Sequence, residues 1–183
     1  MRPASILVAI AVLAAAYAWY LRSEYHRRGN RLFYRDGRPN RLGRGVAGLW
    51  SAMAGLGMPP SFLVSLETTG YRSGRRRAIP VVLADYGGER YIVSMLGERS
   101  PWVRNIRASG GRAVIRHGRR WEVHLAELPP DDRAAVIKAY LARAIDARPH
   151  FPVAWDAPIA AFERIASAYP VFRIEAASQR GGN

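Results

Sequence analysis

Residues 66–81 read LETTGYRSGRRRAIPV, a stretch that predicts two apolar strands joined by a basic turn. Gly70 and Gly74 bracket the turn, and glycine lets backbone N–H groups approach a ligand closely. Hydroxyl and guanidinium groups that can bind an oxyanion are supplied by Thr68, Thr69, Ser73, Arg72 and Arg77. The turn therefore predicts a cradle for a phosphate or a carboxylate.

Two common phosphate-binding motifs do not match this turn. No Gly-Lys-Ser/Thr ends it, as in a Walker loop, and no G-x-G-x-x-G precedes a helix, as in a dinucleotide-binding fold. The alternative is an ordinary basic hairpin whose arginines are solvated. A second signal elsewhere in the chain is needed to decide between the two.

Residues 91–108 read YIVSMLGERSPWVRNIRA and supply that second signal. The pattern predicts a strand that ends at Gly97 and a helix that begins at Pro101, with the Ser100 hydroxyl as its N-cap. The start of a helix offers unpaired N–H groups and the positive end of its dipole, and Arg99 stands beside it. We expect this second anion-binding element to lie at the same sheet as the basic turn.

The rest of the chain predicts a mainly β, α+β domain. Six short strands, mostly in hairpins, indicate an antiparallel sheet or barrel: 61–66, 79–85, 90–96, 112–117, 119–125 and 171–175. Further helices are predicted over 42–58, from Asp131-Asp132 and from Asp156. The helix over 42–58 is amphipathic, so it can pack on the domain or lie on a bilayer, and we expect packing on the domain.

Residues 4–21 read ASILVAIAVLAAAYAWYL, which is long and apolar enough to cross a bilayer as a helix. A signal peptide with a cleavage site near residues 16–18 is the alternative. Arginines are abundant after the segment, so the positive-inside rule places the domain in the cytoplasm, on a single-pass membrane protein. The predicted organisation is an anchor or uncleaved signal over 1–22, a basic juxtamembrane linker over 23–41, a barrel domain over 42–177 and a disordered tail over 178–183.

Composition excludes several classes of function. The chain has no cysteine, so disulfides and thiolate metal sites are excluded, and its four histidines lack metal-ligand spacing, so no metal site is expected. The formal net charge of +14 would suit nucleic acid. Many arginines, however, follow the apolar segment, where they would face anionic lipid, so we expect no nucleic-acid partner.

The turn and the second segment together resemble the deazaflavin-dependent nitroreductase family, whose members use coenzyme F420. The matching residues are T-T-G-x-R-S-G-x-x-R-x-x-P over 68–80 and GERSPWVRNIRA over 97–108. The resemblance covers about 63–108, and residues 169–172 look like the family's closing strand. It implies an FMN-binding-like split β-barrel of about six antiparallel strands with peripheral helices. It also implies hydride transfer from reduced coenzyme F420 to a quinone, nitroaromatic or enone-type acceptor.

The resemblance also implies which residues line the cofactor site. From the turn these are Thr69, Gly70, Arg72, Ser73, Gly74, Arg77 and Pro80. From the second segment they are Leu96, Gly97, Arg99, Trp102 and Asn105. Three side chains are candidates to give a proton to the reduced acceptor, without a choice among them: Tyr140, His150 and Tyr169.

Two residues depart from the family pattern. Tyr71 stands where the family often has a basic residue, and Glu98 would place a carboxylate near a site for an anionic cofactor. FMN or another planar ligand therefore stays an alternative to the deazaflavin. A non-catalytic protein that holds a flavin, haem or lipid on the same barrel is the alternative to an enzyme.

Overall fold

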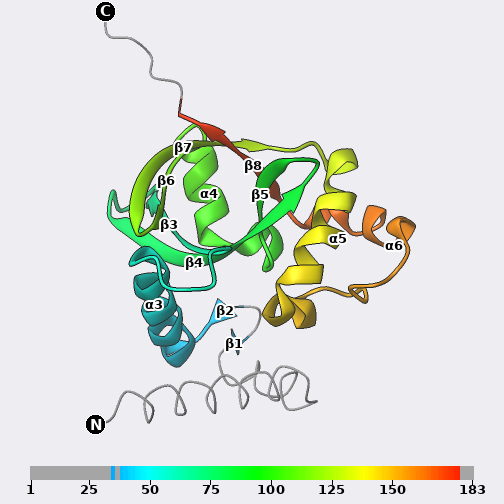
Figure 1. Cartoon of the computed structure of the whole chain (residues 1–183), viewed down its shortest axis with the longest axis horizontal. Coiled ribbons are helices and arrows are strands. Elements are labelled where there is room, and N and C mark those ends of the chain that lie inside the picture. Colours follow the sequence, from blue (N-terminus) through cyan, green and yellow to red (C-terminus); the bar gives the residue numbers. More distant parts are fainter. Residues whose placement is uncertain (1–33, 36–37, 178–183) are drawn as a thin grey trace, which may run out of the picture.

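Six antiparallel strands form a closed barrel in the computed structural model, which describes residues 34–35 and 38–177 (Figure 1). Around the barrel the strands follow the order β3-β4-β5-β8-β7-β6, and β6 pairs with β3 to close it. The strands are β3 (Leu63–Thr69), β4 (Arg76–Tyr86), β5 (Glu89–Val93), β6 (Arg112–His117), β7 (Arg119–Glu127) and β8 (Val171–Ala176). The six-stranded antiparallel barrel predicted from the sequence is thus confirmed.

The β3–β4 hairpin extends beyond the apolar residues that predicted it. In its outermost pairs Thr68 lies opposite Arg77 and Thr69 lies opposite Arg76. Polar side chains next to the turn of a hairpin can stay in water while the backbone hydrogen bonds continue. A run of apolar residues therefore underestimates the length of the strand. Arg76 and Arg77 therefore lie on strand β4, and the turn that connects the two strands is shorter than predicted.

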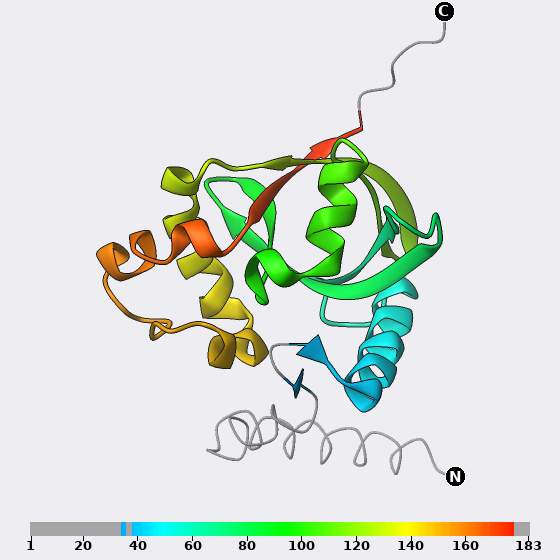
Figure 2. The same cartoon turned by 180° about the vertical axis from the view of Figure 1, so that it is seen from behind.

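The interior of the barrel is filled by alternating strand residues and by one helix. Leu66 faces Ile79 and Leu83 faces Ile92 in neighbouring strands, and all of them belong to one apolar cluster. Helix α4 (Pro101–Ala108) adds three side chains to the same cluster, those of Trp102, Val103 and Ile106. Figure 2 shows α4 lying across the barrel opening, where its apolar side chains complete the core.

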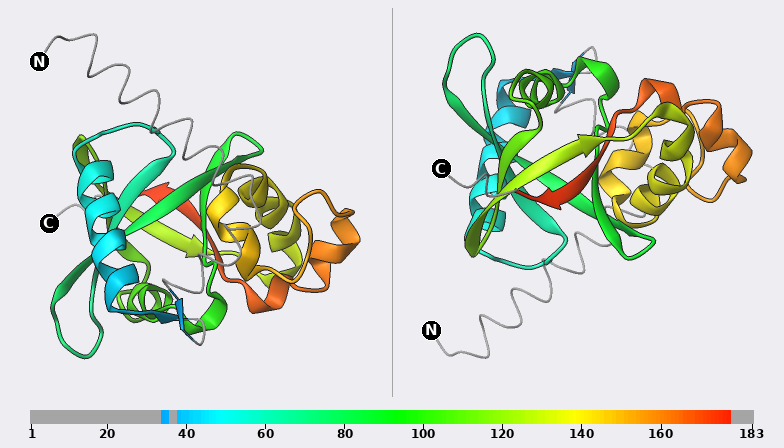
Figure 3. Two further views of the ribbon diagram at one scale, coloured as in Figure 1. Left: turned by 90° about the horizontal axis from the view of Figure 1, so that it is seen from below. Right: turned by 90° about the horizontal axis from the view of Figure 1, so that it is seen from above.

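Helices cover the outer wall of the barrel at two separate places. Helix α3 (Arg41–Gly55) packs on the β3–β4 side, where the Ser51 and Ser65 hydroxyls lie 2.7 Å apart. Helices α5 (Arg133–Arg143) and α6 (Ile159–Glu163) enclose a second apolar cluster over β4, β5 and β8. Figure 3 shows α3 and the α5–α6 pair at opposite ends of the molecule. Packing of the 42–58 helix on the domain is confirmed for one of its faces.

The remaining elements are short. They are β1 (Tyr34–Arg35), β2 (Arg38–Pro39) and four 3₁₀ turns, η1 (Gly97–Arg99), η2 (Pro130–Asp132), η3 (Ile145–His150) and η4 (Ala166–Ala168). One predicted helix start is confirmed and one is wrong by two residues. Asp132 is the N-cap of α5, which follows the η2 turn and begins at Arg133, whereas Pro158 is the N-cap of α6 in place of Asp156.

Within residues 34–35 and 38–177, no helix combines the length and the hydropathy that a membrane crossing requires. The segment predicted to cross, residues 4–21, lies outside the described residues, as do most of the predicted linker and the predicted tail over 178–183.

Candidate functional site

The basic turn between β3 and β4 is closed by backbone hydrogen bonds. The N–H of Gly70 donates to the carbonyl of Arg75 at 2.9 Å, and the N–H of Gly74 donates to the carbonyl of Gly70 at 2.8 Å. Gly74 has a φ of +63°, which a residue with a side chain rarely adopts. The turn is therefore held in one shape although its side chains are exposed.

The arginines of this turn carry positive charge without neutralising partners. No carboxylate in the described part of the chain forms an ion pair with Arg72, Arg75, Arg76 or Arg77. The Arg72 guanidinium lies over the Tyr71 ring, 5.2 Å from its centroid, so the aromatic residue at this position supports an arginine. The turn can accordingly take an external phosphate or carboxylate.

Asn105 of α4 joins the turn to the second segment. Its side-chain Nδ2 donates to Thr68 Oγ1 at 3.0 Å, and its Oδ1 accepts from the backbone N–H of Tyr71 at 3.1 Å. Asn105 is 6% exposed and Thr68 is buried as well. Both motifs singled out in the sequence therefore meet at one end of the barrel, through a buried amide that fixes their relative position.

The loop between β5 and α4 is shaped by two buried hydroxyls. Ser94 Oγ donates to the carbonyl of Gly97 at 2.8 Å and lies 2.6 Å from Ser100 Oγ. Since a hydroxyl has one hydrogen, Ser100 is the donor in that second bond. Ser100 occupies the N-cap position of α4 but makes no side-chain cap, so the predicted capping hydroxyl is wrong. Ser94 holds the loop instead, a role that the sequence did not reveal.

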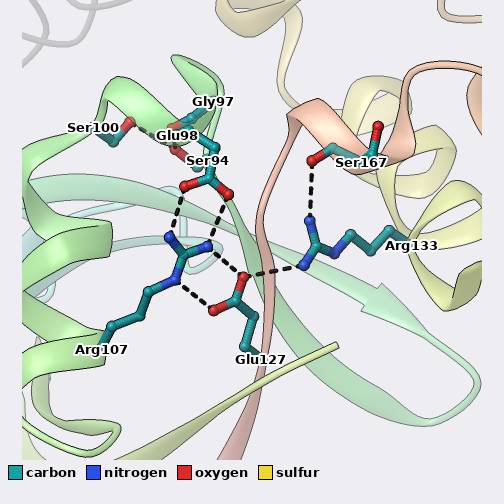
Figure 4. Close-up of polar contacts among 8 residues, drawn as sticks. All are labelled: Ser94, Gly97, Glu98, Ser100, Arg107, Glu127, Arg133 and Ser167. Carbon is teal, nitrogen blue, oxygen red and sulfur yellow. Dashed lines mark hydrogen bonds and ion pairs between the residues drawn. The ribbon is translucent and has the colours of Figure 1, made fainter. Parts of the chain in front are cut away.

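Arg107 neutralises the carboxylate of Glu98 (Figure 4). Its guanidinium donates to both Glu98 oxygens, at 2.6 and 2.8 Å, and also to both oxygens of Glu127, at 2.7 Å each. The hydrogen bond from Arg107 is the main cause that holds the pKa of Glu98 below its usual value. The two carboxylates, Glu127 foremost, raise the pKa of Arg107.

Glu127 in turn binds a buried arginine at the start of α5. Arg133 Nη2 lies 3.0 Å from Glu127 Oε1, and Arg133 Nε donates to the carbonyl of Leu128 at 2.9 Å. The chain of contacts from Glu98 through Arg107 and Glu127 to Arg133 links the β5–α4 loop to β7 and α5. No local sequence pattern predicts this network, because the residues that pair in it are 6 to 20 positions apart in the chain.

With both motifs assembled on one barrel, the relationship of the sequence to known families can be stated. A family model described as F420H(2)-dependent quinone reductase matches residues 50–151, which is more than half of the chain and includes both halves of the site. The chain belongs to this family. Coenzyme F420 is the cofactor that the family's name specifies. The resemblance found in the sequence is thereby confirmed.

Solved structures with similar folds are distant in sequence. One is an F420-H2 dependent reductase, FDR-A, at 18% identity, with 62% of this chain and 94% of that chain covered and a TM-score of 0.43. Another is a conserved hypothetical protein from Mycobacterium tuberculosis, at 14% identity, 78% and 84% coverage and a TM-score of 0.46. A putative pyridoxamine 5'-phosphate oxidase from Listeria innocua has 10% identity, 64% and 85% coverage and a TM-score of 0.43. No protein with a curated description matches the sequence.

The donor set of the site fits an F420-type cofactor. Such a molecule carries a phosphate and carboxylates, and the turn offers arginines that no carboxylate of the described chain neutralises. The nearest acidic group in the second segment, Glu98, is bound by Arg107 on both oxygens, which reduces its repulsion of an anion. The departure at Glu98 is thus compensated by Arg107, a residue that was not among the predicted cofactor residues.

The predicted cofactor residues fall into two groups in the structure of this quinone reductase family member. The turn residues and Arg99 are exposed, Gly70 and Leu96 are partly buried, and Thr69 begins the exposed end of the hairpin. Trp102 is instead 9% exposed and packs against Phe172 inside the barrel, with ring centroids 5.3 Å apart. Pro80 lies opposite Ser65, on the outer wall that α3 covers. Contact of any of the predicted residues with the cofactor stays a prediction.

The three candidate proton donors lie in different surroundings. Tyr140 is 4% exposed and packs in the α5 cluster. Tyr169 is partly exposed, and its hydroxyl donates to the carbonyl of His150 at 2.8 Å while its ring stacks on Phe151. Burial raises the pKa of Tyr169, and the charge of Arg99 opposes that shift. Of the three, Tyr169 is therefore the one whose pKa responds to the charge of Arg99, a residue of the predicted site.

Proposed function

We propose that this protein transfers a hydride from reduced coenzyme F420 to a quinone at a membrane. The observation that carries the proposal is the Asn105 link, which places the basic turn and the β5–α4 loop at one end of the barrel. Membership of the F420H(2)-dependent quinone reductase family supports the reductase chemistry. Nitroaromatic and enone-type compounds are the other acceptors to be compared with quinones.

The residues of the chain have binding and positioning roles in this proposal. Arg72 and Arg77 hold the phosphate and carboxylates of the cofactor, and the backbone N–H groups of the turn add donors to the same anions. Arg107 keeps Glu98 from repelling those charges. The deazaflavin, when bound, supplies the hydride, so the protein needs to position two rings and exclude water.

A quinone that has accepted a hydride needs one further proton to become a hydroquinone, and Tyr169 is the proposed donor beside the site. Its hydroxyl is already oriented by the carbonyl of His150. We further propose that residues 4–21 anchor the chain in a membrane with the barrel on the cytoplasmic side, which would place the site next to a lipophilic quinone.

Titration of the full chain with oxidised coenzyme F420, in parallel with FMN, tests the proposal. Cofactor fluorescence reports binding, and Arg72→Gln and Arg77→Gln should each weaken deazaflavin binding by about tenfold, the loss of one charge-assisted hydrogen bond. Arg119→Gln, an exposed arginine in the β6–β7 hairpin, is the matched control and should leave the affinity unchanged.

Turnover separates an enzyme from a carrier. Reduced coenzyme F420 mixed with the protein and menadione should be oxidised in a protein-dependent reaction. Tight binding of flavin, haem or lipid without any such turnover would replace the proposal by a non-catalytic binding role. Preference for FMN over the deazaflavin would contradict the cofactor assignment.

A further inference from the structure

The outward face of helix α3 carries a stripe of leucines, with the exposed Arg41 and Arg44 beside it. Leu42, Leu49 and Leu56, spaced by seven residues, are 59%, 62% and 73% exposed. Small residues lie between them on the same exposed face: Gly45, Gly48 and Ala52. The opposite face is the one that packs on the barrel, through Gly43, Ser51 and Ala54. A helix of a soluble domain normally presents polar residues to solvent, so this face indicates a partner.

A basic cleft lies beside α3 on the same outer wall of the barrel. Its volume is about 500 Å³, and its lining consists of four arginines, one carboxylate and an alanine: Arg76, Arg77, Arg116, Arg120, Glu67 and Ala78. Ser65, which α3 contacts, and Glu67 project from the same face of β3 because they are two residues apart. A Cβ at Gly55, near the end of α3, would lie 3.9 Å from Arg116 Cβ. The apolar face and the positive cleft are therefore neighbours.

We infer that this side of the protein, the exposed face of α3 together with the basic cleft, docks on an anionic lipid bilayer. Leucines on such a face can enter the boundary between headgroups and acyl chains, while Arg116 and Arg120, the cleft arginines outside the basic turn, contact lipid phosphates. Residues 41–58 contain no aspartate or glutamate, so no acidic group on α3 opposes the docking.

Charge favours the bilayer over a second copy of the chain as the partner. Each chain carries a formal net charge of +14. Two copies joined through this face would bring their arginine-lined clefts close together, and like charges repel at short range. An anionic surface attracts the same groups. The inference does not depend on the proposed reductase function, because it requires neither cofactor nor acceptor.

A fluorescent label placed on α3 tests the docking. The chain has no cysteine, so Leu49→Cys provides one attachment site for an environment-sensitive dye on the full chain. The protein is reconstituted in phosphatidylcholine vesicles that contain roughly one-third phosphatidylglycerol, with a lipid-borne nitroxide as quencher. We expect the emission to shift to shorter wavelength and to be quenched. Glu163→Cys, on exposed α6 at the opposite end of the molecule, is the matched control and should show neither change (Figure 3).

A second set of variants tests whether the arginines of the cleft contribute to docking on the bilayer. The double variant Arg116→Gln/Arg120→Gln, combined with the Leu49 label, should reduce the shift in anionic vesicles. Pure phosphatidylcholine or high salt should do the same. A Leu49 label that stays as water-exposed as the Glu163 label in anionic vesicles would overturn the inference. So would a shift that appears without lipid and grows with protein concentration, because a second copy would then cover α3. Quinone reduction, measured on the same samples, reports the proposed function separately.

Discussion

The Glu98 carboxylate receives two hydrogen bonds from the Arg107 guanidinium, at 2.6 and 2.8 Å. This pairing explains how a family member can carry an acidic residue in the loop that is proposed to face an anionic cofactor. Arg107 lies two residues after Asn105 in α4 and is not among the predicted cofactor residues, so its importance follows from the geometry alone. The same guanidinium also holds Glu127, which ties the loop to the barrel wall.

Replacement of Arg107 by methionine should weaken cofactor binding. The carboxylate of Glu98 would lose its donor and repel the anionic ligand, by roughly 1.4 kcal/mol or tenfold in Kd at low salt. Fluorescence titration measures the change. The double variant Arg107→Met/Glu98→Gln should recover most of the affinity, since the repelling charge is gone. An equal loss in both variants would show that Arg107 acts through the fold and not through charge.

The Glu98–Arg107 pair should make stability depend on pH. The folded-state pKa of Glu98 is lowered, so its contribution to the unfolding free energy is present above the ordinary glutamate value of 4.5 and is lost as the pH falls through the folded value. Chemical denaturation of wild type and Glu98→Gln at several pH values checks this. The difference between the two should be largest near neutral pH and should vanish in acid. Glu163→Gln, on the surface of α6, should show no comparable trend.

Removal of the Asn105 amide should disconnect the two halves of the site. Asn105→Ala leaves the buried Thr68 hydroxyl without its partner, which should cost about 1–3 kcal/mol of unfolding free energy, and the turn should bind the cofactor more weakly. Thr68→Val keeps the bond from Tyr71 N–H to Asn105 and should affect cofactor affinity less. Denaturation and cofactor titration together separate the effects. A folded Asn105→Ala protein with unchanged affinity would contradict the proposed link.

Gly97 should tolerate no side chain, whereas Gly74 should tolerate one better. Both have positive φ, +62° and +63°. A Cβ at Gly97 would lie 2.6 Å from the backbone carbonyl oxygen of Ala168, but a Cβ at Gly74 would meet no atom within 4 Å. Gly74→Ala should therefore cost about 1 kcal/mol, the conformational term alone, and Gly97→Ala distinctly more. Melting temperatures measure both, and equal losses would contradict the close approach of Ala168.

Tyr169→Phe should slow quinone reduction without weakening cofactor binding. Loss of a general acid typically lowers kcat by about 10². Tyr140→Phe is the matched control, because Tyr140 lies in the α5 cluster and should leave kcat unchanged. Steady-state kinetics with reduced coenzyme F420 and menadione measures both. An unchanged kcat in Tyr169→Phe would exclude Tyr169 as the proton donor.

Local patterns in the sequence were enough to predict six antiparallel strands, and the family resemblance selected a barrel over an open sheet. Apolar alternation and glycine-containing turns located all six strands, since each strand buries one face and turns need residues that adopt unusual φ values. Strand ends were less predictable. The β3–β4 hairpin continues through Thr69 and Arg76, because backbone pairing does not require apolar side chains.

The sequence by itself determined the barrel, the basic turn, the helix that begins at Pro101 and membership of the quinone reductase family, because each depends on residues close together in the chain. Only the tertiary structure decided that Asn105 joins the turn to α4, that Arg107 neutralises Glu98 and that Ser94, not Ser100, holds the loop. It also decided which face of α3 stays exposed. The Asn105 contacts join residues 34 and 37 positions apart, which only folding of the barrel brings together. The Ser94 and Arg107 contacts span 3 to 9 residues, but they depend on the path of the β5–α4 loop, which no local propensity encodes.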